Sequence, residues 1–148
     1  MITTISNLAQ AQQALGSGAR WLHLTDPADL DAIIPEARNA NVILTLQSDH
    51  RRVLETLIHG VILGPADTPA AEVRELLGPH AIIGCRVASL FEIMNLAPLD
   101  VDFFVLDLPA EQAAEIIALA RAKGVEQRIA TPCPTPGADA IIAPVNAI

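Results

Sequence analysis

The heptapeptide Ala81-Ile-Ile-Gly-Cys-Arg-Val87 decides how the chain is interpreted. Ile82 and Ile83 are adjacent apolar residues, as expected of a parallel strand that is buried on both faces. Gly84 allows close approach of a neighbouring backbone or ligand, and Arg86 places a permanent cation near the C-terminal end of the strand. In α/β folds that end of the sheet gathers the ligands, so we expect a binding site there.

Seven further short apolar segments resemble this one, most of them starting about twenty residues apart with a helix-like segment between them. Such spacing is itself a repeat signal. The predicted strands cover residues 2–6, 21–25, 42–47, 60–63, 81–87, 102–108, 127–131 and 140–143. The predicted helices cover residues 8–15, 27–39, 49–57, 69–77, 90–96 and 110–123.

Eight such units in order predict an α/β fold of one domain over residues 1–148, a compact (β/α)8 TIM-type barrel. The alternative is a flat, doubly wound sheet of five or six strands. The proline-rich run Pro132-Cys-Pro-Thr-Pro-Gly137 leaves no room for a helix after the seventh strand, and none is expected after the eighth. A second subunit is the expected cover for that side of the barrel, so we predict a homodimer.

The composition of the chain argues against several classes of function. The formal net charge is −8, and 51% of the residues are apolar but only 3% aromatic. Nucleic-acid binding needs clustered basic or stacking aromatic residues, which this chain does not offer. We expect no membrane-spanning segment. Cys85 and Cys133 belong to no recognisable cysteine motif, and two such cysteines fit a cytoplasmic location.

Six segments stand out in chain order: Gly18-Ala-Arg-Trp-Leu-His-Leu24, Gly60-Val-Ile-Leu-Gly64, Leu76-Leu-Gly-Pro-His-Ala-Ile-Ile-Gly84, Val101-Asp-Phe-Phe104, Gly137-Ala-Asp139 and Asn146-Ala-Ile148. Together they resemble the thiamine phosphate synthase family, including its thiazole tautomerase relatives. The resemblance implies a barrel that joins a pyrimidine diphosphate to a thiazole phosphate with the help of Mg²⁺. It implies thiamine biosynthesis, a transferase activity and phosphate binding.

Most polar positions of the family motif carry other residues in this chain. His23 and Thr25 replace a Gln and an Arg, Arg86 replaces a Ser, and the glycine phosphate cradle is replaced by the proline run. Asp67 alone remains in register. The sequence therefore leaves two functions open: transfer or isomerisation of a phosphorylated heterocycle, or a non-catalytic, oligomeric ligand-binding or structural relative.

Alternation along the strands predicts which side chains face the barrel axis. His23 is expected as a general base with a pKa near working pH, or else as a hydrogen-bonded core histidine. Asp107 is its expected catalytic partner. Arg86 is expected to bind an anionic small molecule, or else to form an internal salt bridge to Asp107 or Asp67.

The remaining predicted site residues lie at strand tips and in loops. Thr25, Thr131 and Asn146 are expected to contact the ligand. Asp67 and Asp49 are expected to bind Mg²⁺, although Asp67 has the alternative of capping the helix that follows it.

Overall fold

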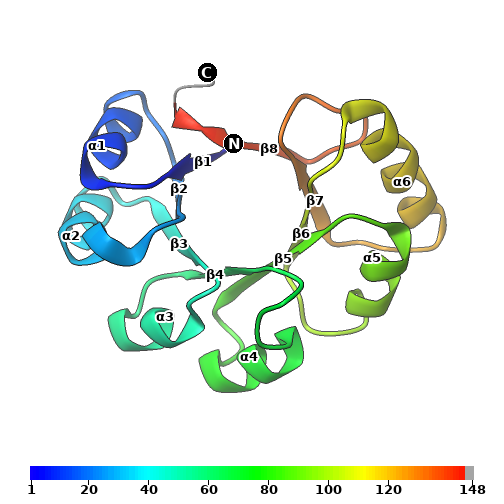
Figure 1. Cartoon of the computed structure of the whole chain (residues 1–148), viewed down its shortest axis with the longest axis horizontal. Coiled ribbons are helices and arrows are strands. Elements are labelled where there is room, and N and C mark those ends of the chain that lie inside the picture. Colours follow the sequence, from blue (N-terminus) through cyan, green and yellow to red (C-terminus); the bar gives the residue numbers. More distant parts are fainter. Residues whose placement is uncertain (146–148) are drawn as a thin grey trace.

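The computed structural model of the chain describes residues 1–145 and contains eight parallel strands in a closed barrel, in the order β1 to β8. The strands pair in sequence order, and β1 pairs with β8 to close the ring. Figure 1 shows the ring of strands from one end, with the helices on its outside. The predicted TIM-type barrel is confirmed, and the flat doubly wound sheet is wrong.

The observed elements follow the predicted ones closely. The strands are β1 Ile2–Ile5, β2 Trp21–Leu24, β3 Ile43–Gln47, β4 Gly60–Leu63, β5 Ile82–Val87, β6 Phe103–Leu106, β7 Arg128–Thr131 and β8 Ala140–Pro144. The helices are α1 Leu8–Gly16, α2 Leu30–Ala40, α3 His50–Thr56, α4 Ala70–Leu77, α5 Leu90–Leu96 and α6 Ala110–Ala122.

One predicted helix is divided. Residues 27–39 begin with a 3-10 turn, Pro27–Asp29, before α2 starts at Leu30. The Asp29 carboxylate accepts a hydrogen bond from the backbone N–H of Leu8 at 2.8 Å, which ties the turn to the first helix. The 3-10 turn before α2 therefore provides an acceptor for a backbone N–H at the start of α1, where helices leave such groups unpaired.

The barrel has two apolar layers, one on each side of the sheet. Between strands and helices lies the larger core, which includes Leu22, Leu44, Ile83 and Phe104. Inside the barrel, toward the N-terminal ends of the strands, a smaller cluster includes Ile2, Ile62, Phe103 and Ile142, packed against Trp21. The polar side chains of the interior therefore lie above this apolar plug, toward the C-terminal ends of the strands.

Gly84 is required by this plug. A Cβ atom at residue 84 would lie 2.4 Å from the ring of Phe103, which is far inside van der Waals contact. The Phe103 ring also meets Trp21 edge to face, with 5.3 Å between ring centroids. The glycine that was expected to allow close approach of a backbone or ligand thus accommodates a core aromatic ring.

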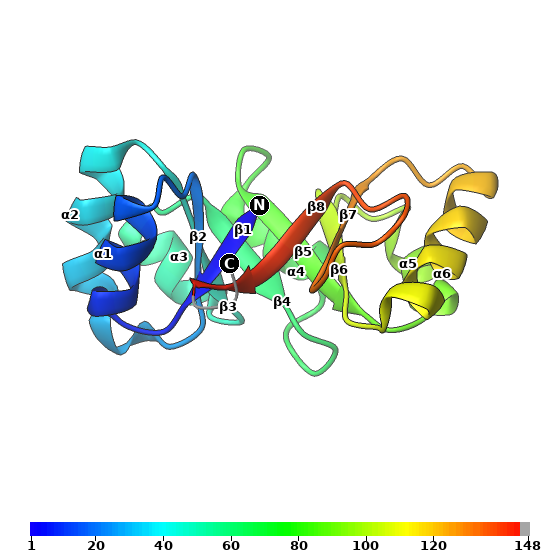
Figure 2. The ribbon, with the colours of Figure 1, turned by 90° about the horizontal axis from the view of Figure 1, so that it is seen from above.

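The connection between β7 and β8, residues 132–139, contains no helix, as predicted from its prolines. Figure 2 shows β8 and the adjacent β1 on a side of the barrel that no helix of residues 1–145 covers. The prediction that no helix follows the eighth strand concerns mainly residues 146–148, which lie outside the described residues. No helix of the described part is long and apolar enough to span a bilayer.

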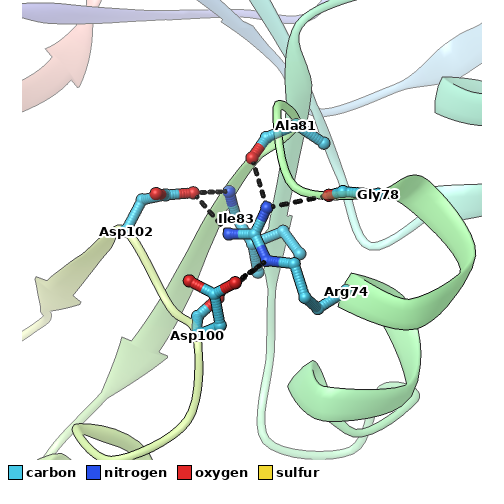
Figure 3. A network of polar contacts seen from close by, with 6 residues as sticks. All are labelled: Arg74, Gly78, Ala81, Ile83, Asp100 and Asp102. Atoms are coloured by element: carbon cyan, nitrogen blue, oxygen red, sulfur yellow. Dashed lines mark hydrogen bonds and ion pairs between the residues drawn. The ribbon is translucent and has the colours of Figure 1, made fainter.

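At the N-terminal ends of the strands, Arg74 of α4 joins several turns of chain (Figure 3). Its Nη1 donates to the carbonyls of Gly78 and Ala81 at 3.1 and 2.7 Å. Its Nη2 lies 2.8 Å from an oxygen of Asp102, and Nε lies 3.3 Å from Asp100. The same Asp102 oxygen accepts from the backbone N–H of Ile83, so one network anchors the start of β5.

Arg121 of α6 makes the same kinds of contact as Arg74. Its Nη1 donates to the carbonyls of Val125 and Gln127, and its Nη2 lies 2.7 Å from Asp139. Asp139 accepts from the backbone N–H of Ile129 at the start of β7. The repeat expected from the strand spacing is therefore also a repeat of polar contacts.

Candidate functional site

A chain of polar side chains crosses the C-terminal rim of the barrel, and Gln47 at the end of β3 is its centre. Gln47 Oε1 lies 2.9 Å from His23 Nε2 and accepts from Arg86 Nε at 3.2 Å. Arg86 Nη1 in turn lies 3.1 Å from Asp107. Three of the predicted site residues, from strands β2 and β5 and the end of β6, are thus brought together, and the residue that joins them was not predicted.

Gln47 belongs to the inward-facing set of β3. Alternation from Ile43 places Thr45 and Gln47 on the inner face, while Leu44 and Leu46 pack in the outer core. This alternation can be followed in the sequence, but an uncharged amide does not by itself mark a strand position as part of a site. An amide both donates and accepts, which allows it to join a histidine to an arginine.

The hydrogen-bond pattern defines the tautomer of His23. Because Arg86 donates to Gln47 Oε1, that oxygen is an acceptor, so His23 Nε2 carries the proton. His23 Nδ1, 2.8 Å from Thr45 Oγ1, then accepts from the hydroxyl, whose oxygen accepts from the Trp21 indole N–H at 3.0 Å. Both ring nitrogens of His23 are therefore used in internal hydrogen bonds.

Burial makes His23 a neutral histidine. The side chain is fully buried. Desolvation, with a smaller contribution from the positive charge of Arg86, lowers its pKa from 6.5 to about 4, against the opposing effect of its bond to Gln47. The expectation of a pKa near working pH is therefore wrong: the imidazole is uncharged at neutral pH.

Arg86 and Asp107 form an ion pair at the surface of the rim. The Arg86 side chain is 25% exposed and that of Asp107 44% exposed. The internal salt bridge considered from the sequence is present, with Asp107 as the partner. Among residues 1–145, Arg86 Nη2 makes no hydrogen bond, so one edge of the guanidinium remains available to a ligand.

Asp67 forms hydrogen bonds within the loop that follows β4 and to the loop that follows β3. One oxygen, Oδ2, accepts from the backbone N–H of Gly64 and from the hydroxyl of Ser48, at 2.6 and 2.7 Å. Ser48 has a left-handed backbone with φ of 66°, and its N–H donates to the carbonyl of Ile62. The capping alternative for Asp67 is wrong, because the N-cap residue of α4 is Pro69 and no side chain caps the helix.

The residues do not fit the expected Mg²⁺ site. Asp49 is the N-cap of α3: its carboxylate accepts from the N–H of Arg52 and lies 3.8 Å from the Arg52 side chain. Asp67 is bound as described above. Residues 1–145 contain no group of three or more acidic, histidine or cysteine side chains placed to hold a metal ion.

The three predicted ligand-contacting residues have different outcomes. Thr25 is exposed at the rim, where its hydroxyl donates to the carbonyl of Ile5 at 3.3 Å. Thr131 is fully buried on the outer side of β7, like Ile129, and its hydroxyl donates to the carbonyl of Cys133. Its expected position at the ligand is therefore wrong, because alternation turns it away from the axis. Asn146 lies outside the described residues.

The fold and the rim together define a (β/α)8 barrel protein with a polar site at the C-terminal ends of its strands. Residues 3–107 match the family model described as thiamine monophosphate synthase. The chain is 30% identical over 120 residues to the thiamine-phosphate synthase of Chlamydia caviae, which covers 80% of this chain and 51% of the relative. It is 31% identical over 121 residues to that of Laribacter hongkongensis, covering 78% and 56%.

The chain belongs to the thiamine monophosphate synthase family. It spans about half the length of the curated relatives it matches. Among solved structures, it resembles a thiamine phosphate pyrophosphorylase from Pyrococcus furiosus with a TM-score of 0.76 at 18% identity, over 95% of this chain and 82% of that one. At that identity the likeness concerns the fold.

Proposed function

We propose that the chain binds a phosphorylated, anionic small molecule at the C-terminal rim, with Arg86 as the anion-binding group. The observation that carries this is the position of Arg86: it faces inward at the end of β5, a quarter exposed, with Nη2 unused among the described residues. A guanidinium offers five N–H groups in a planar fork that matches phosphate oxygens.

The reaction we propose is transfer or isomerisation of a phosphorylated heterocycle in thiamine biosynthesis. Its support is family membership, since the curated relatives are named thiamine-phosphate synthases. In this proposal Asp107 holds Arg86 until the anion arrives, and Gln47 orients the guanidinium. His23 contributes a neutral hydrogen bond that orients Gln47.

A second function is favoured by one specific observation. Both nitrogens of His23 are already bonded within the protein, and burial keeps its pKa at about 4, so it is poorly placed to exchange protons with a ligand. A non-catalytic relative that binds the anion without converting it would have this arrangement.

Calorimetric and thermal-shift titration with inorganic pyrophosphate tests the anion site. At a ligand concentration about a hundredfold above Kd, binding to the folded state adds about 2.7 kcal/mol of stability. Arg86→Ala should abolish this gain. Arg52→Ala removes an exposed arginine of α3 and should retain it. A pyrophosphate effect that is equal in Arg86→Ala would exclude the proposed site.

A positive titration would then direct an activity assay with phosphorylated thiazole and pyrimidine diphosphate. Turnover would support the transferase, whereas tight binding without turnover would support the non-catalytic relative. We expect Mg²⁺ alone to leave the melting temperature unchanged, since Asp49 and Asp67 are engaged elsewhere.

We also propose a homodimer in the cytoplasm. Large apolar side chains are exposed, among them Leu57 at 80% and Leu76 at 51%, and association would remove such surface from water. Both cysteines are free, which suits a reducing compartment. Sedimentation analysis of the full chain tests the dimer directly.

A further inference from the structure

A groove opens beside the polar rim, between the β4–α4 loop and helix α5. Its volume is about 410 Å³, and its lining includes Arg86, Asp67 and Phe91. Arg86 therefore belongs to both the rim network and this groove. Pockets for small molecules commonly enclose about 300–1,000 Å³, so the groove has room for a single ring.

Phe91 is the notable residue of this groove. Its side chain is 75% exposed, whereas Ile93 on the same helix is fully buried and Leu90 packs against the core. The core therefore does not require an aromatic ring at residue 91. An exposed phenyl face in a groove offers a ligand ring an offset-stacked or edge-to-face contact.

We propose that the ring of the ligand lies in this groove against Phe91 while its anionic group binds Arg86. The inference rests on the proposed anion site, and it adds the location and chemistry of the remainder of the ligand. The apolar part of the lining, including Leu63 and Pro65, suits a flat ring, and Asn95 supplies one amide donor and acceptor.

Charge limits the class of ring. The groove also carries the carboxylates of Asp67 and Glu92. Asp67 Oδ2 is held by Gly64 and Ser48, and Glu92 Oε1 accepts from the Ser89 hydroxyl, so both carboxylates are fixed in place. They would repel a second negative group. The ligand is therefore a neutral or cationic ring with its negative charge confined to one end.

Calorimetry with matched probes tests the inference. Phenyl phosphate and methyl phosphate share the anionic group and differ in the ring. We expect the wild-type chain to bind phenyl phosphate about tenfold more tightly, the equivalent of about 1.4 kcal/mol for one aromatic contact. Phe91→Ala should bring the two affinities close together. Leu119→Ala, which truncates an exposed apolar residue of α6, should leave the preference intact.

A third probe examines the charge of the ring. 4-Carboxyphenyl phosphate adds a second anion at the far end of the ring, and we expect it to bind several-fold more weakly than phenyl phosphate. Equal or tighter binding would overturn the part of the inference that assigns the carboxylates a role.

Fluorine NMR gives a readout that does not depend on affinity. The chain has three phenylalanines, and Phe103 and Phe104 are 6% and 0% exposed. With 4-fluorophenylalanine incorporated, phenyl phosphate should shift the resonance of residue 91, assigned with Phe91→Leu, more than methyl phosphate does. A shift of the buried resonances alone would place the ring in the barrel mouth and overturn the inference.

The two proposals fail differently. If both phosphates bind and Arg86→Ala abolishes binding, but Phe91→Ala changes neither affinity, the anion site stands and the groove does not hold the ring. If phenyl phosphate, methyl phosphate and pyrophosphate all fail to bind, the proposed anion site is wrong, and the proposed ring site is wrong as well because it depends on the anion site.

Discussion

Two arginines flank strand β5 and differ in how fully the protein satisfies them. Arg74, at the N-terminal end, is 10% exposed and contacts two aspartates and three backbone carbonyls. Arg86, at the C-terminal end, is 25% exposed and contacts one aspartate and one amide. A guanidinium whose N–H groups are hydrogen-bonded within the protein has a structural role. One with an unused N–H edge at the C-terminal end of a strand is suited to bind a ligand.

The same contrast separates the two ends of the barrel. At the N-terminal end, Arg121 repeats the contacts of Arg74, and the bonds run from a helix to loop carbonyls and to the start of the next strand. At the C-terminal end, the contacts of Arg86 run to the side chains of Gln47 and Asp107, and Gln47 in turn contacts the side chain of His23. The bonds of Arg74 and Arg121 therefore anchor backbone, whereas those of Arg86 position side chains at the end of the barrel where α/β barrels bind their ligands.

The largest expected effect is that of Arg74→Met. Removing the guanidinium leaves three backbone carbonyls and the carboxylates of Asp100 and Asp102 without this partner, and we expect the free energy of unfolding to fall by about 3 kcal/mol. Urea denaturation of the variant measures this directly. A loss below about 1 kcal/mol would show that water replaces the arginine and would remove the distinction between the two ends.

Acid should destabilise the folded chain through His23. The unfolded histidine binds a proton below its ordinary pKa of 6.5, while the buried one does not until about 4. Stability from this group is therefore complete above pH 6.5 and is lost as the pH falls from 6.5 toward 4, by about 3 kcal/mol in total.

Denaturation curves between pH 7 and pH 4 measure this loss, with His23→Gln as the control. The difference between wild type and variant isolates His23 from the carboxylates, which also titrate in acid. Parallel pH dependence in both chains would mean that His23 accepts a proton in the folded state, and would restore it as a candidate general base.

Arg86→Met should cost far less stability than Arg74→Met. Its ion pair with Asp107 is partly exposed, and such pairs contribute about 1 kcal/mol or less. Anion binding should nevertheless be lost. A large loss of stability with unchanged pyrophosphate affinity would instead make Arg86 a structural residue like Arg74.

The smallest expected effect is a gain. Asp107→Asn removes the carboxylate that competes with the ligand for Arg86, so pyrophosphate should bind about threefold more tightly, consistent with a partly exposed ion pair. Calorimetry at two salt concentrations checks the electrostatic origin, since the gain should shrink at high salt. Weaker binding would mean that Asp107 orients Arg86 for the anion.

Strand pattern and spacing were enough to predict the barrel. All eight strands lie within two residues of their predicted limits, because apolar periodicity, glycines and prolines are local signals. The division at Pro27–Asp29 was missed: Asp26 caps the turn by accepting from the N–H of Ala28, and Asp29 accepts from the N–H of Leu8 at the start of α1. A bond between residues 21 positions apart leaves no mark on local periodicity.

The site was predictable only in part. Arg86, His23 and Asp107 were placed together by strand alternation, but the hydrogen bonds of the loop residues Asp49 and Asp67 were not predicted. Each carboxylate has a nearby backbone N–H to accept from, and loop conformation decides which one it reaches.

The sequence by itself determined a barrel of parallel strands and the strand end at which an arginine would stand, since both follow from the period of side chains along a strand. Only the tertiary structure decided what that arginine touches and that Gln47 joins it to His23. Those outcomes depend on which strands become neighbours and on how deeply each side chain is buried, and burial sets the charge of His23.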